Sequence, residues 1–172
     1  MRAGVFLMEA SMSFDSILTR FAESVGAHDS PAFAALFTPD GWYDDYFWGR
    51  HEGREAIAAM LDRFHVGGER FVWEFFEPAQ AGDLAYATYC FSYRSREPES
   101  AGQLVVFEGM ARFRLRDGLI ARYAEVFDRG STFAQLGYET PRIRKLLDRY
   151  AAGYRESPTV QRHVALRARL GR

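Results

Sequence analysis

The feature that most constrains this chain is a change in its hydrophobic period at Gly67-Gly68. Before these glycines, apolar residues recur every three or four positions, as they do on one face of a helix. After them, long runs rich in aromatic and β-branched residues are separated by short turns, as in an antiparallel sheet. Helices followed by a meander of strands predict an α+β fold, in which the helices cover one face of a curved sheet.

Three helices are expected before the change of period. The first spans 13–27, the second begins at Ser30-Pro31 with a serine N-cap and a proline in the first turn, and the third follows Gly53. Pro39-Asp40-Gly41 is typical of a turn, so the first strand is expected only after it, at 42–48.

Four more strands and two more helices are expected after the change of period. Turn signals at Ala81-Gly82-Asp83 and Arg116-Asp117-Gly118 separate long β-type runs. The expected strands are 70–77, 84–94, 104–115 and 119–128. Helical spacing then returns at about 141–154, and Pro158 allows a last helix.

Length and cysteine content place the chain among ordinary soluble domains. A chain of 172 residues can bury one core without a metal or disulfides, and the single cysteine, Cys90, cannot form an internal disulfide. No apolar run approaches the roughly 20 residues that span a bilayer, so we expect a cytoplasmic protein that does not bind membranes. Residues 1–11 show no clear period and are expected to form a flexible leader.

The charge is divided unevenly along the chain. The net charge is −1, but residues 142–172 carry nine Arg or Lys and two Asp or Glu, a net of +7, which leaves −8 for residues 1–141. A basic tail can bind nucleic acid, and it can also dock on an acidic body. The apolar stripe in this tail favours docking on protein, so we expect no nucleic-acid partner. The stripe consists of Ile143, Leu146, Leu147 and Tyr150.

The order of these elements and several short motifs resemble the SnoaL-like branch of the nuclear transport factor 2-like superfamily. The motifs are Ala27-His28-Asp29, residues 33–37, Asp40 to Asp45, Gly53 to Ile57, the closing strand 116–128 and Gln135-Leu136-Gly137. The resemblance implies a cone-shaped, curved antiparallel sheet over residues 12–138, with 139–172 as a basic helical extension. Relatives include ketosteroid isomerase, limonene epoxide hydrolase and phenazine biosynthesis proteins. Because this fold also carries non-catalytic binders, function must be argued from the site.

Asp45 is the first candidate catalytic residue. Its place after the second helix resembles that of the base in ketosteroid isomerases, and Tyr43 precedes it as a tyrosine precedes the water-positioning amide of epoxide hydrolases. Among aromatic neighbours such as Trp48, a carboxylate would lose solvation, and its pKa would rise toward neutrality. The alternative is that Asp45 is solvated at a strand edge.

Glu125 is the second candidate. Alternation along its strand places it on one face with Tyr123 and Phe127. A carboxylate in such a setting is paired, protonated or exposed to a cavity. Its position resembles that of the acidic residue in epoxide hydrolases and phenazine biosynthesis proteins. The alternative is a structural ion pair with Arg112 on the adjoining strand.

The sequence also departs from these relatives. Where an epoxide hydrolase would have Arg and Asp on the third strand of the sheet, this chain has Tyr89 and Phe91. Tyr89 can still donate a hydrogen bond into the cavity. His65, at the end of the third helix, either caps that helix or faces the mouth of the cone. None of the four histidines forms a ligand-type pair, so we expect no metal.

Together these residues predict a cofactor-independent acid/base enzyme, of the isomerase, cyclase, dehydratase or hydrolase type, acting on a small apolar oxygenated ring compound. Asp45 and Glu125 would exchange protons with the substrate. The residues expected to bind it are Tyr43, Trp48, His65, Tyr89 and Tyr123. The alternative is a non-catalytic module that binds a small molecule or dimerises. A homodimer is expected in either case, through a sheet face that carries Val105, Phe107 and Phe113.

Overall fold

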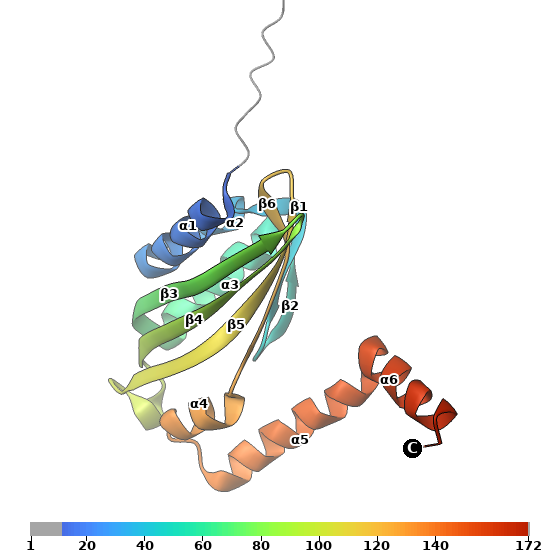
Figure 1. The fold of residues 1–172 in the computed structure, drawn as a ribbon. Coiled ribbons are helices and arrows are strands. Elements are labelled where there is room, and N and C mark those ends of the chain that lie inside the picture. The colour runs from blue at the N-terminus through green and yellow to red at the C-terminus, as the bar shows by residue number, and fades with distance from the viewer. Residues whose placement is uncertain (1–11, 172) are drawn as a thin grey trace, which may run out of the picture.

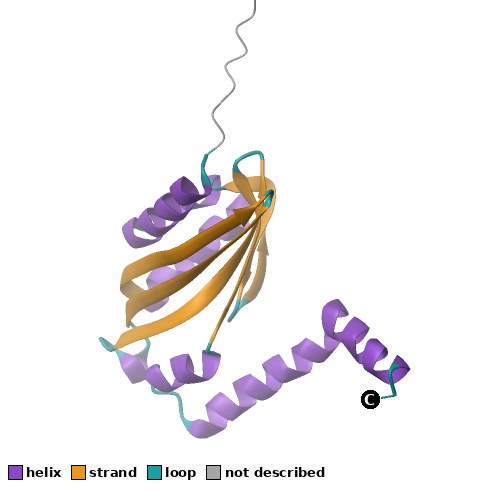
Figure 2. Cartoon of the chain, viewed as in Figure 1, coloured by secondary structure: helices purple, strands orange, loops and turns teal. Residues whose placement is uncertain are grey.

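The computed structural model describes residues 12–171, so the predicted leader at 1–11 lies outside the described residues. The chain forms one curved sheet of six strands with three helices packed on one face, called the inner face below (Figures 1 and 2). The described part contains no helix that is both long enough and apolar enough to cross a membrane. The predicted α+β class is confirmed.

The three N-terminal helices form where the helical period predicts them. They are α1 (Phe14–Ala27), α2 (Ser30–Ala35) and α3 (Gly53–Gly67). The hydroxyl oxygen of Ser13 accepts a hydrogen bond from the Ser16 amide and caps α1, and Asp29 caps α2 in the same way through the Ala32 amide. The apolar stripe of α1 is buried against the sheet, which anchors the helix layer.

The six strands are joined by antiparallel pairs except at one place. They are β1 (Phe37–Asp45), β2 (Gly49–Glu52), β3 (Gly68–Ala81), β4 (Leu84–Ser95), β5 (Leu104–Arg116) and β6 (Leu119–Phe127), in the order β2-β1-β6-β5-β4-β3. The exception is the parallel pair of β1 and β6, in which Tyr43 lies beside Tyr123. This pair joins the first strand to the last and brings both candidate carboxylates to the centre of the sheet.

The expected bounds of two strands, β1 and β3, were wrong. Pro39-Asp40-Gly41 is not a turn but lies inside β1, where the pairing with β6 is irregular between Phe37 and Trp42. Gly41 permits this close approach, because a Cβ atom there would lie 2.9 Å from the Ile120 carbonyl oxygen. The strand expected at 42–48 ends at Asp45, and the chain turns back into β2. Likewise β3 continues past Pro78 to Ala81.

The chain after the sheet is helical, as predicted, with one helix that the periodicity did not reveal. This is α4 (Arg129–Gln135), and it is followed by α5 (Thr140–Glu156) and α6 (Pro158–Arg169). A single 3-10 turn also occurs at Pro98–Ser100. The Gln135 side chain bonds both the amide and the carbonyl of Val106 at 2.9 Å, so it extends the ladder of β5 beyond the end of β6.

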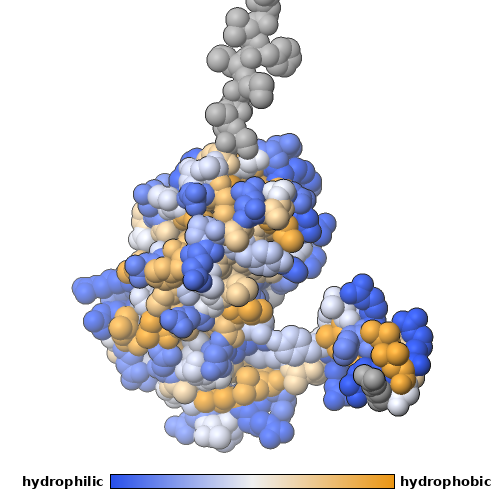
Figure 3. All heavy atoms as spheres, in the orientation of Figure 1, coloured by the Kyte–Doolittle hydropathy of each residue, from blue (hydrophilic) through white to orange (hydrophobic). Residues whose placement is uncertain are grey.

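The basic tail packs against the body through α5, whose contacts run from Ile143 to Tyr154, where the Tyr154 hydroxyl lies 2.6 Å from that of Tyr46. Ile143, Leu146 and Tyr150 join an apolar cluster with Phe133 and Leu136, as the predicted stripe requires. Leu147, the one residue of that stripe outside the cluster, is 38% exposed. No residue of α6 is buried. The helix α6 stands away from the body in Figure 1, and Figure 3 shows apolar atoms on it.

The residues expected on the dimerising face were assigned to the wrong side of the sheet. Val105 and Phe113 are fully buried, and Phe107 packs against the core, so all three point inward. The outer face carries other exposed apolar side chains. They are Val72, Phe76, Tyr86, Val106, Met110 and Val126. One residue of register separates the two sets along β5, which is why the alternation alone did not tell the two faces apart.

Candidate functional site

A cavity of about 600 Å³ lies on the inner side of the curved sheet. Its walls come from the sheet, α3, α4 and α5. Most of its lining side chains are aromatic, including Phe71, Trp73, Phe91, Phe107, Phe127 and Phe133. Both candidate carboxylates, Asp45 and Glu125, also line it. The cavity therefore combines an apolar wall with two acidic groups, the composition expected of a site for a small organic molecule.

Glu125 on β6 is buried and held by three phenol groups. Its Oε2 accepts hydrogen bonds from Tyr89 at 2.8 Å and Tyr123 at 2.9 Å, and its Oε1 accepts one from Tyr43 at 3.3 Å. Burial raises the pKa of Glu125 to about 8, and the negative charge of Asp45 adds to the rise, whereas the three hydroxyl groups oppose it. Glu125 therefore carries its proton at neutral pH.

The alternative role for Glu125, an ion pair with Arg112, is contradicted by the register. Arg112 lies opposite Ala124, and Glu125 lies opposite Ala111, so the two side chains point to opposite faces of the sheet. The expected alternation along β6 is confirmed, because Glu125 shares the inner face with Tyr123 while Val126 is 54% exposed on the outer face.

Asp45, at the end of β1, is also buried rather than solvated at a strand edge. Its Oδ1 accepts hydrogen bonds from the backbone amides of Phe47 at 2.7 Å and Trp48 at 2.6 Å, which shapes the turn into β2. Within residues 12–171, its Oδ2 accepts none. Burial raises the pKa of Asp45 to about 6, although both amide donors oppose this rise. At neutral pH Asp45 is therefore ionised, with one oxygen free to accept a proton.

The three predicted tyrosines are brought together, but their hydroxyl groups do not point at free space. Tyr43, Tyr89 and Tyr123 all donate to Glu125, whereas the sequence suggested that Tyr43 and Tyr89 would donate to a ligand. Burial beside Glu125 raises the pKa of each of them well above its ordinary value, so they stay protonated donors. Trp48 lines the open part of the cavity and is 74% exposed.

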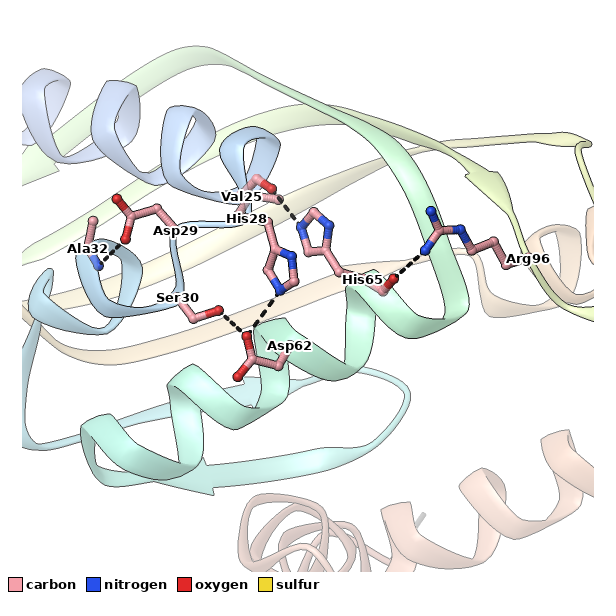
Figure 4. Close-up of polar contacts among 8 residues, drawn as sticks. All are labelled: Val25, His28, Asp29, Ser30, Ala32, Asp62, His65 and Arg96. Atoms are coloured by element: carbon pink, nitrogen blue, oxygen red, sulfur yellow. Dashed lines mark hydrogen bonds and ion pairs between the residues drawn. The ribbon is translucent and has the colours of Figure 1, made fainter.

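His65 does not lie at the cavity. Its ring stacks on that of His28, with centroids 3.9 Å apart, and its Nε2 donates to the Val25 carbonyl oxygen at 2.9 Å (Figure 4). His28 in turn bonds Asp62 on α3. His65 therefore joins the C-terminal part of α1 to α3, and its side chain bonds α1 instead of capping its own helix.

Two residues at or near the cavity, His51 and Arg129, were not found from the sequence. His51 lies on β2, opposite Tyr43, and lines the cavity. Arg129 lies between the rings of Tyr46 and Tyr150, at 3.3 and 3.8 Å from their centroids, and so fastens α5 to the body. The stripe of α5 signalled packing, but only the fold shows that it packs at a cavity. No sequence signal marked His51 or Arg129.

Within residues 12–171, no group of three or more His, Cys, Asp or Glu side chains is arranged to hold a metal ion.

Comparison with known proteins agrees with this fold. A family model described as the SnoaL-like domain matches residues 18–123, more than half of the chain. The chain belongs to the SnoaL-like family. The match ends just before Glu125, so that residue, α4 and α5 lie outside it. No curated protein matches the sequence.

Several solved structures superpose on most of the chain. A Catenulispora acidiphila protein with a ketosteroid isomerase-like fold, in complex with trimethylamine, has a TM-score of 0.67 at 22% identity and covers 74% of this chain and 96% of its own. An epoxide hydrolase of the limonene type from M. tuberculosis has a TM-score of 0.58 at 18% identity, covering 70% and 86%. A candidate polyketide cyclase from Xanthomonas campestris has a TM-score of 0.59 at 24% identity, covering 71% and 95%. At these identities the likeness establishes the fold, and the activities remain those of the relatives.

Proposed function

We propose that this SnoaL-like protein is a cofactor-independent acid/base enzyme, of the isomerase, cyclase, dehydratase or hydrolase type, acting on a small apolar oxygenated ring compound. One observation carries the proposal: two buried carboxyl groups with different raised pKa values line the same aromatic cavity. Pairs of titratable groups that the environment holds in opposite protonation states are typical of acid/base sites. The complex of a relative with trimethylamine supports a small-molecule ligand.

In this proposal the two carboxyl groups have opposite tasks. Asp45, ionised above pH about 6, uses its free Oδ2 to remove a proton from a substrate carbon next to a carbonyl group. Glu125, protonated below pH about 8, donates its proton to the developing oxyanion. The three tyrosines are positioning residues, because they hold the Glu125 carboxyl in place. The aromatic wall excludes water, which strengthens both interactions.

The test is turnover of a panel of cyclic ketones and epoxides by the wild type and two variants. Asp45→Asn and Glu125→Gln keep the shape of each side chain but cannot exchange a proton, so each is expected to lower kcat by at least about 100-fold. Asp44→Asn is the matched control, since Asp44 is the neighbour of Asp45 on the outer face. A wild-type rate on any panel member that survives in both variants would overturn the proposal.

The pH dependence of kcat gives an independent check of the same roles. Activity should rise as Asp45 ionises near pH 6 and fall as Glu125 loses its proton near pH 8, which gives a bell-shaped profile. Asp45→Asn should remove the acidic limb from whatever rate remains. A flat profile between pH 5 and 9 would contradict acid/base chemistry by this pair.

A second function, binding without catalysis, is favoured by the same hydrogen bonds. Both oxygens of Glu125 are already bonded by tyrosines, and Oδ1 of Asp45 shapes a turn, so each carboxyl also has a structural use. A binding module would retain a small molecule in native mass spectra of protein purified from its own host, and would turn over no member of the panel.

A further inference from the structure

The open end of the cavity is built by α5, which lies outside the matched family domain. Leu146, Arg149 and Tyr150 line the cavity from this helix. The Tyr150 hydroxyl donates to the Phe47 carbonyl oxygen at 3.1 Å, and the guanidinium of Arg129 lies against the Tyr150 ring. These contacts hold α5 against the body, so its side chains form part of the cavity wall.

Charge is segregated along the cavity. The acidic lining residues Asp45 and Glu125 are buried, so they lie at the closed end. The exposed lining residues include three arginines, Arg63 on α3 and Arg142 and Arg149 on α5, and the half-buried Glu97 is the carboxylate beside them. The open end therefore carries an excess of positive charge.

Two of the three arginines are available to a ligand. Arg142 is engaged by Glu99 at 3.1 Å and lies over the ring of Tyr138. Within residues 12–171, neither Arg63 nor Arg149 forms an ion pair. Since a guanidinium can only donate, these two groups offer hydrogen-bond donors that no carboxylate of the described chain accepts.

His51 holds one of these two arginines in place. Arg63 lies 3.3 Å from the Nδ1 of His51, and an arginine only donates, so Nδ1 is the acceptor and the proton of the neutral ring is on Nε2. This Nε2 is buried and has no hydrogen-bond partner among the described residues. Since this Nε2 is buried, His51 contributes to the open end through its Nδ1, which accepts from the Arg63 guanidinium and holds it beside the cavity.

From these observations we propose that the open end of the cavity binds an anionic oxygen group, a carboxylate or a phosphate, through Arg63 and Arg149, with His51 as a positioning residue for Arg63. The ligand is then an apolar ring compound that carries an acidic group, with its ring against the aromatic wall and its reacting carbon toward Asp45. This inference names the substrate class of the proposed function and rests on it for the use of the cavity.

Equilibrium binding to the full chain tests the inference without any turnover. Isothermal titration calorimetry at pH 7.5 compares 1-naphthaleneacetate with 1-naphthaleneacetamide, which has the same ring and no charge. Charge-assisted hydrogen bonds predict a dissociation constant at least about tenfold lower for the acid. Arg149→Gln should reduce this preference to less than about threefold and leave the affinity for the amide unchanged. The matched control is Arg162→Gln on α6, which should keep the preference.

A third probe, 1-naphthyl phosphate, identifies the source of the anionic group. Tighter binding of the phosphate than of the acetate assigns the site to phosphorylated ligands, and the reverse assigns it to carboxylic acids. Equal affinities for the acid and the amide would overturn the inference, as would absence of binding by all three probes or a preference that survives in both Arg149→Gln and Arg63→Gln. The Asp45→Asn variant separates this inference from the proposed catalysis. It should still bind the acid more tightly than the amide, although it should no longer turn over a substrate.

Discussion

At the scale of single residues, Glu125 is subject to two opposing influences. Removal from water and the charge of Asp45 favour its neutral form, while hydrogen bonds from three tyrosines favour the carboxylate. Desolvation is the larger effect, so the group is protonated where an ordinary glutamate is ionised. The sequence indicated this residue through its place in an alternating strand, but the tyrosine cluster depends on β1 pairing with β6 and on Tyr89 of β4 reaching across β5. No local sequence pattern records either arrangement.

A titration of stability tests the protonation of Glu125. Its pKa in the folded chain, about 8, lies above its ordinary value of 4.5, so the native state binds more protons than the unfolded state between these pH values. The free energy of unfolding should therefore fall as pH rises from about 4.5 to about 8, by on the order of a few kcal/mol, and Asp45 adds to the fall up to pH about 6. Glu125→Gln should flatten this dependence in urea unfolding at pH 5 and pH 8. Glu108→Gln, on the exposed side of β5, is the control and should retain the wild-type slope.

Gly109 is the residue on which the position of Tyr89 depends. A Cβ atom at this position would lie 2.4 Å from the Tyr89 hydroxyl oxygen, so only glycine allows the phenol to lie across β5 and reach Glu125. Gly109→Ala should destabilise the fold by roughly 1–3 kcal/mol and shift the pH dependence of unfolding. Gly153→Ala is the matched control, since nothing lies within 4 Å of a Cβ there and the change should raise helix stability slightly. Equal melting temperatures for the two variants would contradict the close contact.

At the scale of elements, periodicity predicted those with a long apolar stripe and missed the others. The stripe of α1 and the alternation of β5 and β6 are clear because each buries one face along its whole length. The strand β2 has no such signal, since Gly49-Arg50-His51-Glu52 lies at the edge of the sheet and β1 is its one strand partner among the described residues. The helix α4 is too short to show a period. The start of β1 was hidden because Pro39-Asp40-Gly41, a common turn sequence, here forms an irregular stretch of strand.

The division of the basic tail into a docked and an undocked part predicts different effects of two changes. A chain that ends at Ser157 lacks α6, which buries no residue, so its melting temperature should remain within about 1–2 °C of that of the full chain. Ile143→Ala removes a side chain that α5 packs against the body and should lower the melting temperature by several degrees. Thermal unfolding followed by circular dichroism measures both. A large loss on removal of α6 would mean that this helix contacts a surface in solution, such as a second copy of the chain.

At the scale of the whole molecule, the candidate site depends on the meeting of the two ends of the sheet-forming region. The parallel pair of β1 and β6 places Tyr43 beside Tyr123, and with them the strands that carry Asp45 and Glu125. Asp45 and Glu125 are 80 residues apart in the sequence, so local patterns could not place one relative to the other. The resemblance of short motifs to SnoaL-like proteins supplied that arrangement and the expectation of a cavity, whereas the α5 wall of the cavity came only from the structure.

The exposed outer face of the sheet supports the predicted homodimer, with a different set of contacts from the one first expected. Met110 on β5 lies opposite Val126 on β6, and Val106 lies farther along the same face of β5, beyond Glu108. Exposed apolar side chains on a sheet are typical of an interface, and a two-fold axis would let the same face pack on itself. Multi-angle light scattering at micromolar concentration should therefore give about twice the chain mass of 19.7 kDa.

Val126→Asp should shift the protein to the monomer mass, because it would bury an unpaired charge at the centre of the interface. Val164→Asp on α6 is the control with an equally exposed valine, and it should leave the mass unchanged if the sheet alone forms the dimer. A wild-type mass of about 20 kDa, or a dimer that persists in Val126→Asp, would contradict an interface through this face.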